Sequence, residues 1–507
     1  MTTLVRELSA ADLPIARQPR NDLVAEVATD DGRFTARAGP FQEYERTLEQ
    51  DSDGRWSETF RYELAPMVWA WLLHHAYRMA LLRRPAPGHT PWWSPPEAPD
   101  RRGSTVLGTL CYLALVFGFI GTLLTQTITF AADEFDASKT DQSAVLSLVR
   151  IGVLGALIVT TLADRRGRRR ILLSVATAGC SIAALSSLAP DLLSLGVSQT
   201  LVRGCATAGG VLVGIVAAEE MPAGSRAFSF SLIAAAGALG AGLCLMVLPL
   251  ADLGDGGWRL VMAASILLLP LVRLAGRHLP ESRRFDAAHA QAPMAGHGSR
   301  FWLLAASALL LALFTAPASQ LLNEFLRDEE GFAAWQITVF TIVTNTPGGI
   351  GLVIGGRLAD TRGRRPVGAF GVAAGTLLTV AMVLLGGWPM WGLSIAAAIA
   401  GAMVVPAIAV YGPELFPTSL RGRANGIIAI LGVTGSVTGL LTAGWLSERW
   451  DGLGPALALL SIGPLVMAVL VLVAYPETAH RELEDINPED RIDPPGSVSS
   501  DHGAPVH

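Results

Sequence analysis

The chain has 507 residues, of which 51% are hydrophobic and 16% are charged, and its formal net charge is −5. A soluble domain carries about 25% charged residues, so this composition argues against a string of ordinary soluble domains. The four cysteines lie singly inside apolar stretches, which excludes a disulfide framework and is typical of small packing residues.

Residues 1–104 are more polar and are expected to form a small cytoplasmic α+β extension. Residues 32–50 and 55–64 are predicted to be two strands joined by the turn "DSDG". A helix is predicted for residues 65–84, and a proline-rich linker follows it. The helix either lies on the membrane, with Trp69 and Trp71 at the interface, or packs on the small sheet. Residues 1–25 contain no apolar core, so no cleavable signal peptide is expected.

Twelve later stretches are long and apolar enough to span a membrane, which requires about 20 mostly apolar residues. They are residues 106–131, 143–163, 170–189, 192–218, 227–250, 258–276, 301–323, 335–358, 367–387, 389–411, 424–446 and 454–475. Only "GGWPMW" separates the ninth stretch from the tenth. The predicted fold class is an all-α multi-pass membrane protein with twelve transmembrane helices in two six-helix halves and a small α+β cytoplasmic N-terminal extension.

The arginines predict how the chain is oriented. The loops after spans two, six, eight and ten are basic, whereas the alternate loops are acidic or nearly neutral. Because positively charged loops stay in the cytoplasm, these loops and both chain ends are expected there, with the protein in the cell membrane. Arg273 and Arg357 lie near cytoplasmic helix ends, where they are expected to snorkel toward lipid headgroups.

Three patterns recur at a nearly constant offset. The hairpin "LADRRGRR" returns as "LADTRGRR", so that Asp164 and Asp360 are 196 residues apart. The pattern E-x-x-P-x-x-x-R occurs at residues 219–226 and again 195 residues later, at 414–421. "PES" at residue 280 returns as "PET" at residue 476. This repeat predicts two six-helix halves in the same orientation.

Each copy of the hairpin places an aspartate at the end of one helix and arginines at the start of the next, around Gly167 or Gly363. Asp164 and Asp360 can pair with arginines of their own hairpin or of a neighbouring helix end. A single surface pair contributes about 0–1 kcal/mol, but a network between two moving halves can bias which side is open. The alternative is that the arginines only hold the loop in the cytoplasm, which leaves the aspartates unexplained.

At these residues the sequence resembles the major facilitator superfamily of secondary transporters, whose signature G-x-L-A-D-R-x-G-R-R recurs in both halves. The second copy, "GRLADTRGRR", differs by a threonine, and the first has Thr160 in place of glycine. "PESRRF", "PET" and the E-x-x-P-x-x-x-R copies resemble the sugar-porter and metabolite–proton symporter branch. The resemblance implies a cytoplasmic ion-pair gate formed by Asp164, Arg165, Gly167, Arg168, Arg169, Glu219, Arg226, Asp360, Gly363, Arg364, Arg365, Glu414 and Arg421.

Substrate residues are expected at mid-membrane between the halves, where a charge is costly and usually functional. Arg150 in the second span and Arg203 in the fourth lie at similar depth, and no acid lies at that depth. Such a pair suits a carboxylate or another anion, which arginine can bind bidentately. By the resemblance, Arg203 is near the place of an arginine linked to proton coupling. The alternative is that each arginine snorkels or is paired structurally. Polar candidates for the same cavity are Gln126, Gln320, Asn323 and Asn345.

The sequence therefore predicts a monomeric secondary transporter in the lipid bilayer that moves a small organic solute, with a carboxylate favoured, coupled to protons. The sugar-porter "QQ" motif is missing from span seven, so a sugar is not expected. The alternatives are an exporter of drug-like compounds, and a membrane sensor whose N-terminal domain signals. The histidines show no metal spacing and no phosphate-binding loop occurs, so no enzyme activity, cofactor, metal or nucleic-acid binding is expected. The predicted divisions are residues 1–104, 105–285, 286–300 (a central loop), 301–478 and 479–507 (a tail).

Overall fold

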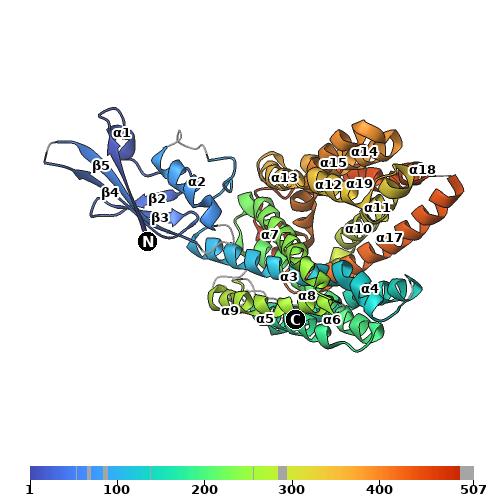
Figure 1. The fold of residues 1–507 in the computed structure, drawn as a ribbon. Helices are drawn as coiled ribbons and strands as arrows, with labels where there is room; N and C mark the ends of the chain where they lie inside the picture. Colours follow the sequence, from blue (N-terminus) through green and yellow to red (C-terminus); the bar gives the residue numbers. More distant parts are fainter. Residues whose placement is uncertain are drawn as a thin grey trace, which may run out of the picture.

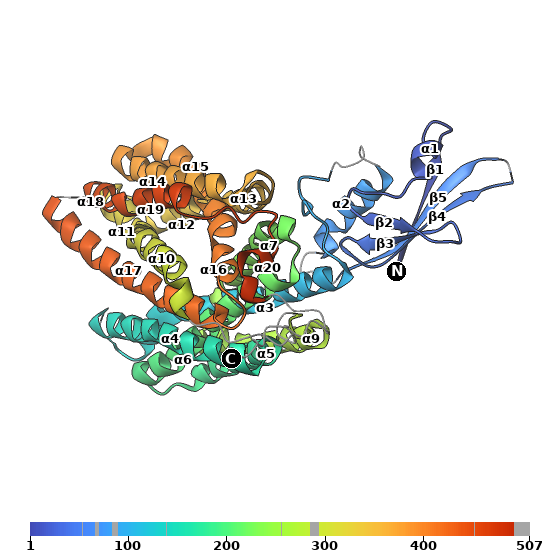
Figure 2. The same ribbon diagram turned by 180° about the vertical axis from the view of Figure 1, so that it is seen from behind.

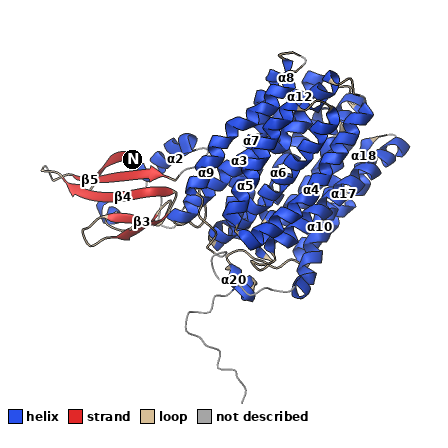
Figure 3. Ribbon diagram, turned by 90° about the horizontal axis from the view of Figure 1, so that it is seen from below, coloured by secondary structure: helices blue, strands red, loops and turns tan. Residues whose placement is uncertain are grey.

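The structure is a computed structural model that describes residues 1–52, 54–65, 70–83, 90–137, 139–254, 256–283, 294–450 and 452–490. A small sheet domain at the N-terminus lies beside a large bundle of helices (Figures 1 and 2). Figure 3 shows the bundle helices running side by side, with the sheet outside them. Trp69, most of the predicted central loop and the end of the predicted tail lie outside the described residues.

The N-terminal sheet is antiparallel, with the strand order β1-β5-β4-β3-β2. The strands are β1 (Thr2–Leu8), β2 (Ala25–Ala28), β3 (Phe34–Ala38), β4 (Phe41–Gln50) and β5 (Trp56–Leu64), with the short helix α1 (Leu13–Ala16) after β1. The strand predicted for residues 55–64 is confirmed as β5. The prediction of one strand for residues 32–50 is wrong, because Gly39 has a φ of +153° and precedes Pro40, which breaks the segment into β3 and β4. β1 and β2 were not predicted, since β1 buries only Leu4 and its apolar residues Leu4 and Val5 are adjacent in the sequence and do not alternate with polar ones.

Helix α2 (Ala70–Leu82) packs on this sheet. Its Tyr77 and Leu81 are buried in one hydrophobic cluster with Phe41 and Phe60 of the strands. This contact agrees with the second alternative for the predicted helix, in which it covers the sheet. The domain thereby gains a core of its own, built from one face of the sheet and one face of the helix.

A buried ion-pair cluster crosses the sheet. The Arg46 guanidinium donates to both carboxylate oxygens of Glu26, at 2.8 and 2.6 Å, and to Oε1 of Glu58 at 2.8 Å. All three side chains are buried. We expect Arg46→Ala to destabilise the sheet by about 3–5 kcal/mol, because it leaves two carboxylates buried without this cation. Hydrogen–deuterium exchange of the β4 and β5 amides in the full chain measures this loss. Arg33→Ala, which removes an exposed pair with Glu45, is the matched control and is expected to leave exchange nearly unchanged.

The bundle divides by chain order into two halves. The first half contains α3 (Arg101–Glu134), α4 (Lys139–Arg166), α5 (Arg168–Leu185), α6 (Leu192–Glu220), α7 (Arg226–Val247), α8 (Gly257–Ala263) and α9 (Leu269–His278). The second half contains α10 (Gly298–Gln320), α11 (Leu322–Glu324), α12 (Ala334–Asn345), α13 (Gly348–Arg362), α14 (Arg364–Leu385), α15 (Gly387–Ala409), α16 (Tyr411–Glu414), α17 (Arg421–Trp450), α18 (Leu453–Leu460) and α19 (Ile462–Val473). The short helix α20 (Leu483–Ile486) follows.

Eleven helices within the described residues are long and apolar enough to cross a membrane. They coincide with eleven of the twelve predicted spans. The remaining span, 143–163, falls in α4, a 28-residue helix that is not among the eleven. The predicted break between spans nine and ten is confirmed, because the chain turns at Gly386, which has a φ of +55°, between α14 and α15.

Close helix crossings repeat in the two halves. A Cβ atom at Gly240 of α7 would overlap the carbonyl oxygen of Leu115 on α3. A Cβ atom at Gly435 of α17 would overlap the carbonyl oxygen of Leu309 on α10. Gly240 and Gly435 are 195 residues apart, the offset of the sequence repeat. The crossings of α3 with α7 and of α10 with α17 therefore require glycine at equivalent positions.

The prediction that Arg357 snorkels toward headgroups is wrong. Its guanidinium donates to the carbonyl oxygens of Pro91 and Ser94, at 2.8 and 2.7 Å, and to Thr90. The proline-rich linker therefore folds back onto α13. A sequence cannot show this contact, because it joins residues that lie more than 260 positions apart.

Candidate functional site

A cavity of about 570 Å³ lies between the two halves of the bundle. It is lined by residues of α3, α4 and α6 from the first half and of α10, α11 and α17 from the second. Four of the six predicted substrate residues line it, namely Arg150, Arg203, Gln320 and Asn323. Arg150 Nη2 donates to Gln320 Oε1 at 2.9 Å, so one hydrogen bond crosses between the halves at this cavity.

The two arginines come from helices that are in close contact. A Cβ atom at Gly152 of α4 would overlap the carbonyl oxygen of Thr200 on α6. This glycine lets the two backbones approach, and it stands two residues after Arg150 and opposite the turn that carries Arg203. The Arg203 guanidinium points at α3, where it reaches the carbonyl oxygen of Gly121 at 3.5 Å. No aspartate or glutamate is among the described residues that line the cavity.

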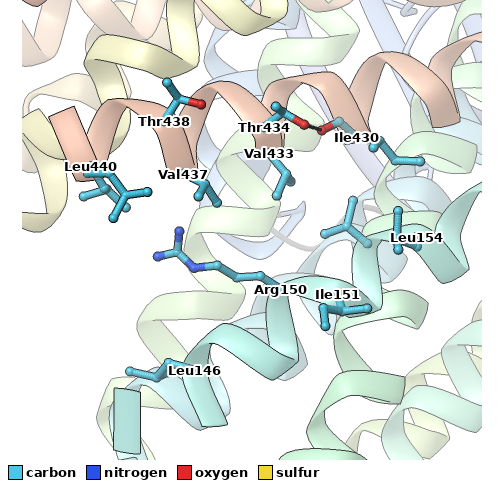
Figure 4. A pocket seen from close by; sticks show the side chains of 12 residues that line it. Leu146, Arg150, Ile151, Leu154, Ile430, Val433, Thr434, Val437, Thr438 and Leu440 are labelled. Carbon is cyan, nitrogen blue, oxygen red and sulfur yellow. Dashed lines mark hydrogen bonds between the residues drawn. The ribbon is translucent and has the colours of Figure 1, made fainter. Parts of the chain in front are cut away.

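A second cavity, of about 860 Å³, adjoins Arg150 between α4 and α17. Figure 4 shows Arg150 extending from α4 toward Val437 of α17. Apart from Arg150, the lining is apolar except for Thr434 and Thr438, and Thr434 already donates to the carbonyl oxygen of Ile430 at 3.1 Å. Arg150 therefore stands between a cavity of mixed polar and apolar lining and a largely apolar one.

Two predicted substrate residues lie elsewhere. Asn345 lines a separate cavity of about 540 Å³ within the second half, together with Asn323. Gln126, on α3, is outside the residues that line the central cavity. The position of a residue along a span gives its depth in the membrane but does not decide which cavity of the bundle its side chain faces.

The predicted gate residues gather at one end of the bundle, which we call the basic end, where α4 meets α5 and α13 meets α14. In the first half, Arg168 pairs with Glu219 and, at 3.7 Å, with Asp164. Glu219 also pairs with Arg421 of the second half, which lies 3.0 Å from Asp490. Arg168, Glu219 and Arg421 are buried, so these charges depend on one another.

The second half repeats the arrangement. Arg364 pairs with Glu414 and, at 3.5 Å, with Asp360. Glu414 also pairs with Arg226 of the first half at 3.2 Å. Each half thus holds an Asp–Arg–Glu set that takes an arginine from the other half.

The two aspartates bind the first turns of helices in the opposite half. Asp164 accepts hydrogen bonds from the backbone N–H groups of Gly422 and Arg423, at 3.3 and 3.2 Å, where α17 begins. Asp360 accepts from the N–H groups of Ala227 and Phe228, at 3.1 and 2.8 Å, where α7 begins. A helix N-terminus carries unpaired N–H groups and a partial positive charge, so it stabilises a carboxylate placed there.

Two further glutamates belong to this network and were not predicted as site residues. Glu281 accepts from the backbone N–H groups of Arg168 and Arg169, at 2.8 and 3.0 Å. Glu477 accepts from those of Arg364 and Arg365, at 3.0 and 3.2 Å. They cap α5 and α14, each of which begins just after a turn glycine in a positive-φ conformation, Gly167 at +97° and Gly363 at +102°. The sequence signal that could have identified these two glutamates is the recurrence of "PES" as "PET", since each copy contains one of them.

The remaining predicted gate arginines act within one half or face outward. Arg169 donates to the carbonyl oxygens of Leu279 and Gly276, at 2.5 and 2.8 Å, where α9 ends. Arg365 donates to the carbonyl oxygen of Leu472 on α19. Arg165 is exposed. Arg169 thus connects α5 to the end of α9, and Arg365 connects α14 to α19, each within its own half.

Comparisons with known proteins agree with this geometry. The family model "Major Facilitator Superfamily" matches residues 108–388 and 321–499. A gallate transporter of Pseudomonas putida is 27% identical over 424 residues, covering 72% of this chain and 90% of the relative. A D-xylose transporter of Levilactobacillus brevis is 28% identical over 172 residues, covering 34% of this chain and 38% of that protein. These relatives confirm the predicted resemblance to metabolite and sugar symporters.

Solved structures share the fold. The proton:xylose symporter XylE, bound to 6-bromo-6-deoxy-D-glucose, superposes with a TM-score of 0.64 at 18% identity and covers 75% of this chain and 97% of its own. The human organic anion transporter MFSD10 (TETRAN) superposes with a TM-score of 0.59 at 16% identity, covering 74% and 100% of the two chains.

Proposed function

Because the chain belongs to the major facilitator superfamily, we propose that it is a proton-coupled secondary transporter that moves a small organic carboxylate by alternating access. It is a multi-pass membrane protein, and α4 completes a set of twelve spans, arranged as halves over residues 105–285 and 301–478. The basic end faces the cytoplasm, since positively charged loops are retained there. Both chain ends then lie in the cytoplasm, and the monomer lies in the cell membrane.

The placement of Arg150 and Arg203 is the observation that carries this proposal. Both line a cavity to which both halves contribute, and the described lining contains no carboxylate to neutralise them. A cation placed at membrane depth without an acid partner is costly, and an anionic solute lowers that cost. Arginine binds a carboxylate through two parallel hydrogen bonds, which gives orientation as well as affinity. Gln320, which holds Arg150 across the halves, would orient its guanidinium.

The apolar cavity beside Arg150 bears on the kind of carboxylate. A solute whose carboxylate lies at Arg150 would have the polar residues of the first cavity, such as Arg203 and Gln320, on one side and the valines and leucines of α4 and α17 on the other. An aromatic or branched carboxylate fits these two environments, because its apolar body is removed from water while its charge is paired. The relative from Pseudomonas putida carries the name of such an aromatic carboxylate, gallate. Because another relative is named a D-xylose transporter, the experiment that tests the proposal also includes a neutral sugar.

The charge network at the basic end supports alternating access. The pairs of Glu219 with Arg421 and of Glu414 with Arg226 join the two halves, and so do the hydrogen bonds that Asp164 and Asp360 accept. All of them must separate when the halves move apart at this end. We assign to the predicted gate residues that bond between the halves the role of holding the basic end closed. Proton coupling rests on the family resemblance at Arg203.

Counterflow in proteoliposomes tests the substrate class without assuming a driving ion. Vesicles loaded with gallate or benzoate should accumulate the same labelled carboxylate from outside. Vesicles loaded with xylose should not accumulate labelled xylose, and vesicles loaded with a cationic dye should not accumulate that dye. The carboxylate proposal predicts exchange of the acids and no exchange of their neutral amides. Exchange of sugar or dye, with the acids inert, would contradict it and favour a sugar symporter or an exporter of drug-like compounds.

A further inference from the structure

The linker between the sheet domain and the bundle bridges both halves of the transporter. Residues 90–97, which we call the strap, contact the second half through Arg357 of α13. The Arg357 guanidinium donates to the carbonyl oxygens of Pro91 and Ser94, at 2.8 and 2.7 Å, and to the carbonyl and hydroxyl oxygens of Thr90, at 3.2 and 2.8 Å. One cation thus fixes the first five residues of the strap, because its planar donors match several acceptors at once.

The other end of the strap is bound to the first half. The backbone N–H of Glu97 donates to Ser225 Oγ at 2.8 Å, and Ser225 Oγ lies 2.7 Å from the carbonyl oxygen of Glu97. The backbone N–H of Gly224 donates to Glu97 Oε2 at 2.8 Å. A Cβ atom at Gly224 would lie only 2.7 Å from that oxygen, so the loop before α7 is closely fitted to the strap.

Two contacts join the halves at the basic end, one between α7 and α13 with Glu414 and one between α4 and α17 with Glu219, which we call the gate contacts. The strap runs across the first of them. Ser225 directly precedes Arg226, which pairs with Glu414 of the second half. Arg357 lies three residues before Asp360, whose carboxylate accepts from the first turn of α7. The strap therefore joins the same two helices, α7 and α13, that this contact joins directly.

The other gate contact has no equivalent of these strap-binding residues. At the offsets of the repeat, the position that matches Arg357 is Thr161, and the position that matches Ser225 is Leu420. Neither side chain can supply the same bonds, since threonine carries no guanidinium and leucine no hydroxyl. Residues that can bind the strap in this way therefore stand at one of the two repeat-related contacts between the halves and not at the other.

The sheet domain holds the strap from both sides. The Trp93 ring packs edge-on against Tyr77 of α2, with 5.0 Å between the ring centroids. Just after the strap, the carbonyl oxygen of Pro99 accepts from the N–H of Gly39 at 2.8 Å, and Ser104 of α3 donates to the carbonyl oxygen of Gly39 at 2.7 Å. A displacement of the sheet domain would therefore pull on the strap.

We propose that residues 1–100 form a gate-control element, in which the strap stabilises the closed basic end by binding Arg357 and Ser225 at the same time. This inference rests on the proposed alternating access. When α7 and α13 separate, the strap can keep only one of its two attachments. Opening therefore requires release of one of them, and a ligand or partner that moves the sheet domain would change how often the basic end opens.

Distance measurement between spin labels at Arg166→Cys and Arg362→Cys tests this role in the full chain, with the four native cysteines replaced by alanine. Both positions are exposed at the basic end, one on each half, and they are related by the repeat. Arg357→Ala is expected to raise the open population about tenfold and Ser225→Ala about fivefold. Both variants weaken the same bridge, although Ser225→Ala leaves the bond from the Gly224 N–H to Glu97 Oε2. The double variant should therefore open less than the product of the two single effects predicts. Arg273→Ala, an exposed arginine of α9, is the matched control.

Asp360→Asn serves as the gate reference, since it weakens the direct contact between the same helices. If Asp360→Asn lengthens the distance but Arg357→Ala and Ser225→Ala do not, the strap has no role in the gate and the inference is wrong. Independent additive effects of the two strap variants would also overturn it, because two local contacts would then act without a bridge. If Asp360→Asn itself changes nothing, the proposed gate fails and the strap inference fails with it.

Discussion

Arg421→Ala is expected to open the basic end of the bundle, with a change of about 100-fold or more in the ratio of closed to open molecules. Glu219 is buried between Arg168 and Arg421, and only Arg421 comes from the other half. Its removal leaves the carboxylate with Arg168 as its cation and with the Ser282 hydroxyl, and breaking a buried pair costs about 3–5 kcal/mol. Separation of the halves hydrates Glu219 and removes much of that cost, so the open state gains relative to the closed one.

The distance between labels at Arg166→Cys and Arg362→Cys reports this shift directly. Arg423→Ala is the matched control, because its exposed side chain is removed while its backbone N–H still serves Asp164. Arg226→Ala, the equivalent change at Glu414, should lengthen the distance in the same direction. Distance distributions for Arg421→Ala that match those of Arg423→Ala would show that the inter-half pair does not hold the gate closed.

Arg150→Ala is expected to weaken carboxylate binding by about 10- to 100-fold. A hydrogen bond to a charged group contributes about 1.5–3 kcal/mol, which corresponds to the expected loss. We expect the loss of about one such bond, although arginine can donate two, because Arg203 remains in the cavity as a second cation. Arg150→Lys keeps the charge but loses the planar pair of donors, so it should recover only part of the affinity. Gln320→Ala, which removes the side chain that holds Arg150 at 2.9 Å, should have a smaller effect.

Isothermal titration with the acid that exchanges fastest in counterflow, and with its neutral amide, separates charge recognition from a change in cavity shape. The unchanged protein should prefer the acid over the amide, and Arg150→Ala should lose most of that preference. Equal losses of affinity for acid and amide would mean that Arg150 supports the cavity structurally and does not bind the carboxylate.

The repeated motifs identified most of the gate from the sequence, but not how it is assembled. The constant offset of 195 or 196 residues paired Asp164 with Asp360 and Glu219 with Glu414. It could not show that each aspartate binds the first turn of a helix in the opposite half, because that depends on which helix ends meet in space. It also grouped Arg169 and Arg365 with the gate, although both bind carbonyl oxygens within their own half.

Hydropathy identified the bundle, whereas the N-terminal region was predicted poorly. Long apolar stretches are an unambiguous pattern, and eleven of them reappear as helices able to cross a membrane within the described residues. Strands β1 and β2 of the N-terminal region were missed, and β2 carries Glu26 of a buried charge cluster that no alternation of apolar residues reveals. The cavity shows the same limit, since depth placed Arg150 and Arg203 together but also suggested Gln126 and Asn345, which do not line it.

Uptake of the exchanging carboxylate into proteoliposomes with an imposed inward proton gradient tests the central claim most directly. The account predicts accumulation that requires the gradient, collapses when a protonophore is added, and falls at least tenfold in Arg150→Ala while Arg273→Ala stays unchanged. Gradient-driven uptake that is equal in the unchanged protein and in Arg150→Ala would contradict the claim that this arginine-lined cavity carries the solute.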